Sequence, residues 1–384
     1  MLNSLGFARP PHECRIAVAM SGGVDSSVVA ALLKSQGYDV VGITLRLYDQ
    51  GQVSRKGSCC AGVDIADAQA TAASLDIPHY VLDFEERFRR AVIDDFVDTY
   101  AAGRTPIPCV RCNERVKFGD LLDIARDMGV DALATGHYAR WCLGPDGPEL
   151  HKAHDLNRDQ SYFLFATTPA QLAQLRFPLG EMTKPEVRSQ ALRFGLRVAD
   201  KQDSQDICFI PDRDHAGFIA RMRPDAAKSG DIVHVDGQRL GRHQGVLRYT
   251  VGQRRGLGVA AGERLYVIEL DAAKARVTVG PRDAGEASAM IVRQPNWLAV
   301  PRAGQTLNVR HRYNEGDVPG TLARLEEGAF EIRFTRPQAG IAPGQACVLY
   351  DETRLLGGGW IERSVRVQAD EPAALFTDQT AASG

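Results

Sequence analysis

The stretch that most constrains the fold of this chain is RIAVAMSGGVDSSVVAALLKSQGYDVVG, residues 15–42. A short apolar run over residues 16–20 precedes a turn of small residues, and apolar residues then recur at helical spacing until Gly37. Gly22 and Gly23 can adopt positive φ and allow a ligand close to the backbone, and the helix that follows presents unpaired N–H groups to an anion. The stretch therefore predicts a strand, an anion-binding turn, a helix and a second strand.

The turn SGGVDSS differs from two widespread nucleotide-binding loops. It lacks the Lys-Ser/Thr pair that closes the Walker loop, and it lacks the spacing of GxGxxG. It resembles the SGGxDS loop of the PP-loop ATP pyrophosphatases, which implies that the loop holds the pyrophosphate of ATP. An ordinary strand-to-helix turn rich in small residues is the alternative interpretation.

Length and composition bound the class of protein. The chain has 384 residues, more than one compact domain usually holds, and 44% of them are apolar. The formal charge of −2 gives no overall sign of nucleic-acid binding, so local patches must decide. Eight cysteines without an apolar leader favour reduced thiols and a cytoplasmic location, and no apolar run reaches the length of a membrane span.

Strand and helix signals alternate up to residue 211, which predicts an α/β fold with a doubly wound parallel sheet. Short strands with Gly and Pro turns follow and predict a small central domain and an antiparallel β-barrel. Residues 1–14 are expected to be a loose lead-in. The predicted domains are a PP-loop ATP-binding catalytic domain over 14–211, a central connector over 212–283, a C-terminal β-barrel over 284–366 and a disordered tail over 367–384.

Two cysteines lie among prolines and basic residues in GRTPIPCVRCNERVKF, residues 103–118. Pro106 and Pro108 predict an exposed turn, outside helix and inner strand, that presents Cys109 and Cys112. Half of a zinc site, for which a second spaced pair is missing, and two inert thiols are the alternatives. Positive charge favours the reactive thiolate, and it is supplied here by Arg111, Arg115 and Lys117.

Three further segments carry candidate site residues. Cys208 lies in KQDSQDICFIP, where the apolar residues after it, taken alone, favour a buried core cysteine over a reactive one. His137 follows an apolar strand in ATGHY, at the edge where parallel sheets bind ligands, and a packing histidine fits that position as well. A polar, glycine-bearing loop over residues 51–62 is expected to contact substrate.

Two arginine-rich segments are candidates for RNA binding. Five arginines and His243 fall between residues 239 and 255 without any acid, and Tyr249 is interleaved with them. Residues 302–313 repeat the pattern and end in Tyr313, an aromatic residue that can stack on a base. A solvated, turn-rich surface is the alternative interpretation.

The motifs SGGVDSS, GRTPxPxxxCN, ATGHY, DQSYFL and CFI occur in this order, and together with GQRRGLG and PGQ they resemble the tRNA-specific 2-thiouridylases over residues 14–362. The resemblance implies an enzyme that uses ATP and Mg²⁺ to convert O2 of the wobble uridine of tRNA into an adenylate, and that then replaces this oxygen with sulfur. It implies that Cys208 carries the sulfur as a persulfide and that Cys112 releases it by forming a disulfide with Cys208. The implied partners are tRNA and a sulfur-donor protein, either a persulfide relay protein or a cysteine desulfurase.

The resemblance also assigns ligand positions. Nucleotide contacts are implied for Ala19, Met20, Ser21, Gly22, Gly23, Val24, Asp25, Ser26, Leu45 and Gly136. Contacts with the target base are implied for Ile107, Pro108 and Cys109. Contacts with tRNA are implied for His137, Arg158, Asp159, Gln160, Arg312, Tyr313 and Gln345.

One position departs from a well-represented form of the family pattern. Cys109 stands where that form has an aspartate, so a thiol replaces a carboxylate that can act as acid or base. Cys109, Cys112 and Cys208 make a three-thiolate set, which in related tRNA-thiolating enzymes holds an iron–sulfur cluster, so a cluster is the alternative to the persulfide relay. A non-catalytic tRNA-binding protein and an amidating PP-loop ligase are further alternatives. The cysteines beside the loop disfavour the former, and the arginine segments disfavour the latter.

Overall fold

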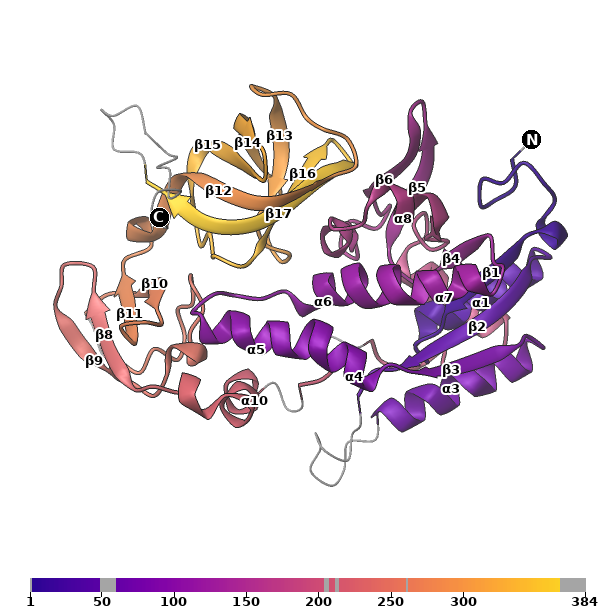
Figure 1. Cartoon of the computed structure of the whole chain (residues 1–384), viewed down its shortest axis with the longest axis horizontal. Coiled ribbons are helices and arrows are strands. Elements are labelled where there is room, and N and C mark those ends of the chain that lie inside the picture. Colours follow the sequence, from indigo (N-terminus) through magenta and orange to yellow (C-terminus); the bar gives the residue numbers. More distant parts are fainter. Residues whose placement is uncertain (1, 49–59, 204–206, 211–213, 260–261, 367–384) are drawn as a thin grey trace, which may run out of the picture.

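The computed structural model describes residues 2–48, 60–203, 207–210, 214–259 and 262–366 (Figure 1). Most of the loop expected over residues 51–62 and all of the tail expected over 367–384 lie outside these residues. Within the described part of the chain, none of the helices combines the length and the apolar character needed to cross a membrane.

The first part of the chain forms a five-stranded parallel sheet in the order β3-β2-β1-β4-β7. The chain fills the sheet on one side of β1 and then on the other, so its switch point lies between β1 and β4. These strands are β1 Arg15–Ala19, β2 Asp39–Arg46, β3 His79–Asp83, β4 Ala132–Ala134 and β7 Leu175–Arg176. The predicted doubly wound parallel sheet is confirmed.

Helices cover both faces of this sheet, because alternate residues of β1 are buried on opposite sides. Ile16 and Val18 pack in one core with α1 and α9, whereas Ala17 packs in another core with η3 and α7. The α-helices of this part are α1 Val24–Ser35, α3 Cys60–Ser74, α4 Glu85–Phe88, α5 Asp94–Ala101, α6 Pro108–Arg111, α7 Leu122–Asp127, α8 Pro169–Gln174 and α9 Lys184–Arg193.

Two stretches of π-helix interrupt these helices. Arg89–Ile93 (η2) joins α4 to α5, and Cys112–Leu121 (η3) joins α6 to α7. The prediction of an exposed, non-helical turn at the cysteines is therefore wrong: Pro108 is the first residue of α6, where its missing N–H costs no helical hydrogen bond. Both Cys109 and Cys112 are presented by helix.

The lead-in, which the sequence predicts to be loose, is docked on the domain. Leu5 is buried, and the guanidinium of Arg176 donates to its carbonyl at 2.6 Å. The same guanidinium lies 3.9 Å from the ring centroid of Trp141 and 4.8 Å from that of Phe7. A buried arginine therefore fixes this segment against the edge of the sheet.

The rest of the described chain forms two β-structures, as predicted. A four-stranded sheet has the order β10-β11-β8-β9, and six strands close a barrel through the pairing of β12 with β17. The hairpin of β5 and β6 joins the barrel through β17, which connects the first domain to the last (Figure 1). The bounds are β5 Ala139–Gly144, β6 Gly147–Lys152, α10 His215–Met222, β8 Gly230–His234, β9 Arg239–His243, β10 Tyr266–Asp271, β11 Arg276–Gly280, β12 Glu286–Trp297, β13 Thr306–Arg310, β14 Val318–Glu326, β15 Ala329–Ala339, β16 Ala346–Asp351 and β17 Arg354–Val365.

Candidate active site

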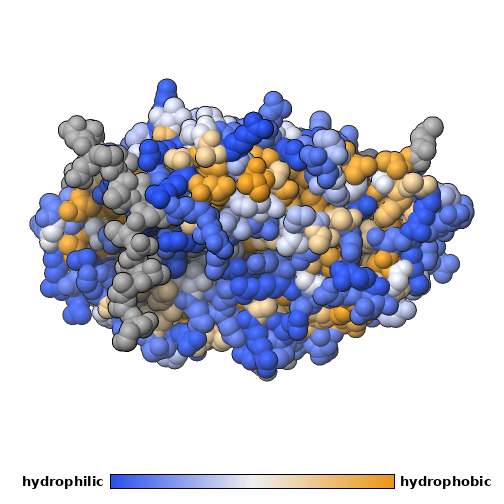
Figure 2. Space-filling view, turned by 45° about the horizontal axis from the view of Figure 1, so that its top comes forward, coloured by the Kyte–Doolittle hydropathy of each residue, from blue (hydrophilic) through white to orange (hydrophobic). Residues whose placement is uncertain are grey.

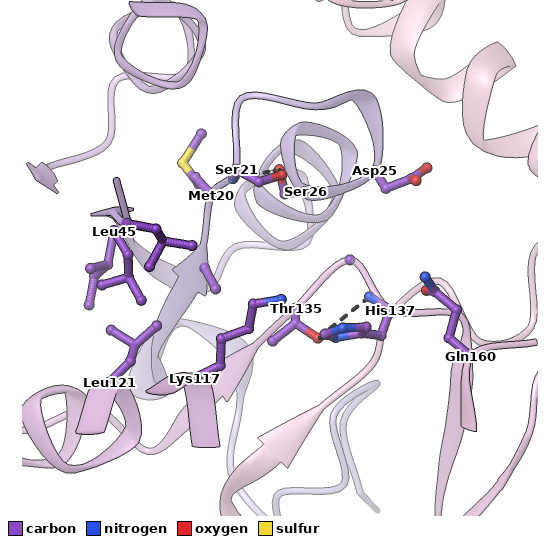
Figure 3. A pocket seen from close by; sticks show the side chains of 14 residues that line it. Met20, Ser21, Asp25, Ser26, Leu45, Lys117, Leu121, Thr135, His137 and Gln160 are labelled. Carbon is purple, nitrogen blue, oxygen red and sulfur yellow. Dashed lines mark hydrogen bonds between the residues drawn. The ribbon is translucent and has the colours of Figure 1, made fainter. Parts of the chain in front are cut away.

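A pocket of about 230 Å³ lies at the carboxyl edge of the parallel sheet, beside the switch point where open α/β sheets bind ligands (Figure 3). Its walls come from the ends of β1, β2 and β4, the start of α1, and η3. The lining residues are Ala19, Met20, Ser21, Asp25, Ser26, Ile43, Leu45, Leu47, Lys117, Leu121, Thr135, Gly136, His137 and Gln160.

The structure gathers most of the expected nucleotide contacts in this pocket and places others beside it. Gly22 and Gly23 belong to the loop ahead of α1, and Val24 is buried in the core under that loop. His137 and Gln160, which the sequence assigns to tRNA, line the nucleotide pocket.

The backbone of the loop is tightly held and leaves no room for side chains. Gly22 has φ of +72°, and a Cβ there would lie 2.7 Å from the Cα of Asp64. A Cβ on Gly136 would lie 2.9 Å from the amide nitrogen of Ser26. Lys201 fixes the loop from outside, since its ammonium donates to the Gly22 carbonyl at 3.0 Å and pairs with Asp64 at 2.7 Å. A helix N-terminus behind such a cradle is suited to phosphate.

The carboxylate of Asp25 is already neutralised by protein. Lys184 donates to its two oxygens at 2.7 and 2.9 Å, and the hydroxyl of Tyr138 donates to Oδ1 at 2.9 Å. Lys184 is itself buried and also pairs with Asp203 at 2.8 Å. The loop acid therefore belongs to a buried ionic network that extends away from the pocket.

His137 is held as a neutral imidazole. Its Nδ1 lies 2.8 Å from the hydroxyl of Thr135, and the rings of Phe118 and Phe177 meet it edge-on. Burial, followed by the charge of Lys117, lowers the pKa of His137 well below its usual value. His137 therefore combines the packing role that was one alternative for it with a place in the pocket wall.

The three thiols lie near one another. Cys112 is buried in an aromatic cluster that also contains Phe209, whereas Cys109 and Cys208 reach the surface. Phe209 contacts Phe88 and Phe96 through ring centroids 5.7 and 5.4 Å apart, which anchors the segment that bears Cys208. All three thiols are free.

The prediction that basic neighbours favour the thiolates is wrong, because the net effect of the surroundings on each cysteine favours the neutral thiol. Desolvation by the surrounding protein raises the pKa of all three thiols, and it raises that of Cys208 to about 12, where the neighbouring thiols Cys112 and Cys109 add to the effect. Arg111 and Arg115 bring little net charge, since they pair with Glu114 at 2.9 Å and with Asp95 at 3.1 Å. The charge of Lys117 is the one that lowers these pKa values.

The expected target-base residues begin α6 and are tied to the barrel. Ile107 and Pro108 are buried, while Cys109 is exposed. The segment just before them is fixed by Thr105, whose amide donates to the Pro343 carbonyl at 2.8 Å. Gln345, an expected tRNA contact, donates to the Thr105 carbonyl at 3.2 Å. Gln345 therefore positions the cysteine segment from the barrel side.

Two expected tRNA contacts have internal partners. The carboxylate of Asp159 is fully buried and accepts hydrogen bonds from Ser161 and, at 3.0 Å, from Arg310. Arg158 pairs with Asp203 at 3.0 Å. In this conformation Asp159 has only its backbone to offer a ligand, and its side chain links the first domain to the barrel.

Arg312 and Tyr313 also act between domains. The guanidinium of Arg312 donates to the Gly340 carbonyl at 2.8 Å and to the Val251 carbonyl. The ring centroid of Tyr313 lies 4.3 Å from that of Phe163. Within residues 302–313, the guanidinium of Arg312 is therefore engaged by protein in this conformation and His311 is buried, while contact of Arg312 and Tyr313 with tRNA stays a prediction.

The segment over residues 239–255 is divided between core and surface. His243 and Tyr249 are buried, which corrects their assignment to an RNA-facing patch. Within the described ranges, four exposed arginines of this segment have neither an ion pair nor a hydrogen bond from the side chain; these are Arg242, Arg248, Arg254 and Arg255. The face in Figure 2 is mainly hydrophilic, with smaller apolar areas.

In the part of the chain that the structure describes, no three His, Cys, Asp or Glu side chains are gathered so that they could hold a metal ion. The three thiols are neighbours without forming such a set in this conformation. The pocket itself offers backbone amides, hydroxyls and one ammonium, which are donors suited to phosphate.

Comparison with known proteins decides the family. Residues 14–212 match the tRNA methyl transferase HUP domain, residues 216–281 the tRNA methyl transferase PRC-barrel domain, and residues 287–361 the aminomethyltransferase beta-barrel domain. The tRNA-specific 2-thiouridylase MnmA of Hyphomonas neptunium is 55% identical over 380 residues, which cover 96% of each chain. The chain belongs to the tRNA-specific 2-thiouridylase family. This confirms the resemblance seen in the sequence.

A second relative matches nearly the same length of the chain as the first. The tRNA-specific 2-thiouridylase MnmA of Rhodospirillum centenum is 57% identical over 373 residues, covering 94% of this chain and 95% of the relative. A 4-thiouridine synthetase solved with RNA and ATP has a TM-score of 0.33 and 14% identity, covering 55% of this chain and 51% of that one, a likeness too weak to argue from.

Sequence reasoning missed three lysines of the site. It treats Lys117 only as a charge near the cysteines, and it assigns no role to Lys184 or Lys201. The partners of Lys184 and Lys201 lie far away in the sequence, at separations of 159 and 137 residues. Only the folded chain brings such pairs together, whereas the helical register of Lys117 could have indicated that it shares a helix with Cys112.

Proposed function

We propose that this protein catalyses the ATP-dependent 2-thiolation of the wobble uridine of tRNA, in the cytoplasm. The observation that carries the proposal is the shared helix η3, which contributes both to the nucleotide pocket and to the thiol cluster. An oxygen is a poor leaving group until it is adenylated, so an ATP site and a sulfur nucleophile must serve one bound base. The free arginines of residues 239–255 supply a surface for tRNA phosphates.

In this proposal the phosphate loop binds the pyrophosphate portion of ATP and its Mg²⁺. The wobble base leaves its stack and lies beside Cys109, between the phosphate loop and Cys208. The terminal sulfur of a Cys208 persulfide attacks C2, and AMP leaves. The Cys112 thiolate then attacks Sγ of Cys208, which leaves the sulfur on the base and forms a disulfide that an external dithiol must reduce.

An iron–sulfur cluster on Cys109, Cys112 and Cys208 is a second candidate, favoured by the neighbourhood of three thiols in a chain that has a cysteine where one well-represented form of the family has an aspartate. The residues match a cluster in number and chemistry, and the three thiols would have to be brought together to hold it. Such a cluster would bind and activate the sulfur that the first mechanism places on the Cys208 persulfide.

The experiment is tRNA thiolation by purified protein with ATP, Mg²⁺ and a persulfide donor, scored as 2-thiouridine by mass spectrometry of digested tRNA. We expect product with the native chain and none with Cys112→Ser or Cys208→Ser, with Cys142→Ser as the matched control. Cys109→Ser decides the sulfur chemistry: retained activity supports the relay, and lost activity together with lost iron after anaerobic purification supports the cluster. Binding of tRNA without any thiolation would instead indicate a non-catalytic tRNA-binding protein.

A further inference from the structure

Lys117 extends from η3 into the nucleotide pocket, where Figure 3 shows its side chain across from Ser21 and Ser26. Within the part of the chain that the structure describes, its ammonium has no carboxylate partner and no hydrogen bond. A lysine that faces a cavity without an internal partner is available to a ligand.

The charges around the pocket leave Lys117 uncompensated. Asp25, His137 and Lys117 are the charged or titratable side chains among the lining residues. Asp25 is neutralised by two bonds from Lys184, and His137 is held neutral by burial. The described wall therefore carries one net positive charge, set beside apolar residues that weaken solvent screening. The pocket selects an anion at the end where Lys117 lies.

The position of Lys117 indicates which part of a nucleotide that anion is. Ser21 and the loop amides lie on one side of the pocket, and Lys117 faces them from the helix that bears Cys112. In an α-helix, residues five apart point about 140° away from each other, whereas the wider π turns of η3 bring them closer to one face. The charge of Lys117 opposes the rise that desolvation causes in the pKa of Cys112, so the ammonium lies near the thiols. Lys117 thus stands between the phosphate loop and the thiol cluster.

We propose that Lys117 binds the α-phosphoryl group of ATP and stabilises the charge on its non-bridging oxygens while this group is transferred to the base. The inference rests on the proposed function, in which the loop holds pyrophosphate and the base lies by the thiols. In the transfer, O2 of the uridine forms a bond to the α-phosphorus as the bond to the β-phosphate oxygen breaks. Pyrophosphate leaves with that electron pair, and the N3 proton of the uridine passes to water.

The test separates the two halves of the nucleotide by calorimetry of the full chain with AMP and, separately, with pyrophosphate. For Lys117→Met we expect the Kd of AMP to rise about tenfold or more, as the loss of a charge-assisted hydrogen bond requires, and the Kd of pyrophosphate to stay within about twofold. Lys34→Met, at an exposed lysine of α1, is the control and leaves both unchanged. Lys117→Arg keeps the charge and should restore most of the AMP affinity.

Unchanged AMP binding in Lys117→Met overturns the inference, and so does an equal loss of AMP and pyrophosphate binding, which would mark a structural role. A kinetic readout adds the transition state: release of pyrophosphate in the presence of tRNA should fall about 100-fold in Lys117→Met. If the native chain releases no pyrophosphate with tRNA, the proposed function fails, whereas the AMP and pyrophosphate contrast still decides the role of Lys117.

Discussion

At the scale of single residues, the phosphate loop requires glycine at position 22, where there is no space for a side chain. Gly22 combines positive φ with backbone of Asp64 where its Cβ would be, whereas Gly37 has φ of +88° and open space around it. A substitution at either position costs about 1–2 kcal/mol for the left-handed backbone, but only the one at Gly22 must also displace the neighbouring helix. Substitutions at the two glycines therefore distinguish the effect of backbone strain, which both share, from the effect of a steric clash, which occurs only at Gly22.

We expect Gly22→Ala to weaken pyrophosphate binding at least about tenfold, since the loop amides must move out of their arrangement. Gly37→Ala should lose a similar amount of stability from φ alone and keep native pyrophosphate affinity. Calorimetric titration and urea unfolding of both variants check this pair. Equal pyrophosphate affinities in the two variants would mean that the loop tolerates the shift and that the cradle does not set the affinity.

At the scale of elements, the four free arginines of residues 239–255 lie on β9, on the 3-10 helix Val246–Arg248 and in the loop that follows it. Arg254 and Arg255 are exposed in the loop between Gly252 and Gly256, whose φ values of +85° and +73° turn the backbone sharply. Arginines on such a turn project into solvent, where they can reach phosphates. His243 and Tyr249, from the same arginine-rich stretch, instead fill the core beneath.

Replacing Arg254 and Arg255 with alanine should weaken tRNA binding and flatten its dependence on salt. The slope of log Kd against log salt should fall by about one unit for each phosphate that the variant no longer binds, with nucleotide binding unaffected. Filter binding at several salt concentrations measures the slope, with Arg193→Ala on the distant α9 as control. A double variant with the native slope would place the tRNA on another surface.

Elements also show what the sequence could and could not predict. Hydrophobic periodicity and turn residues sufficed for β1, α1 and the barrel strands, because those patterns are local. The β5–β6 hairpin was missed although Pro-Asp-Gly at residues 145–147 is a strong turn signal. The sequence predicts a non-helical turn at Cys109 because proline breaks helices, but proline also favours the first position of a helix, where Pro108 lies.

The residues of the candidate site also fall into those that the sequence could predict and those that only the folded chain reveals. Residues of one local motif, such as Ser21 and Ser26, were found because the loop is contiguous. The counter-charge of Asp25, supplied by Lys184, comes from a helix that the sequence did not predict. The sequence does not show that Arg310, within the charged segment over residues 302–313, pairs with Asp159, because the two residues are distant in sequence. Whether a charge faces solvent or a buried partner is a tertiary property.

At the scale of the whole molecule, the domains are joined by buried polar contacts as well as by apolar packing. The ion pair of Asp159 with Arg310 links the first domain to β13 of the barrel, with side chains 0% and 12% exposed. Arg310 also pairs with Asp317 at 2.8 Å. Breaking one partner of such a pair leaves a buried charge without compensation, which typically costs about 3–5 kcal/mol.

We therefore expect Arg310→Met to destabilise the chain by about 3–5 kcal/mol and to split a single thermal transition into two, because the barrel and the ATP-binding domain are no longer linked by this pair. The double variant Asp159→Asn with Arg310→Met should recover part of the loss, since the buried Asp159 carboxylate is then gone while Asp317 still pairs with Lys152, and the cycle of variants isolates the coupling. Arg293→Met, which breaks the exposed pair with Glu362 at 2.9 Å, is the control and should cost no more than about 1 kcal/mol. Differential scanning calorimetry with urea unfolding gives both quantities. If Arg310→Met costs no more than Arg293→Met and melts in one step, apolar packing alone couples the domains, and the buried pair is dispensable.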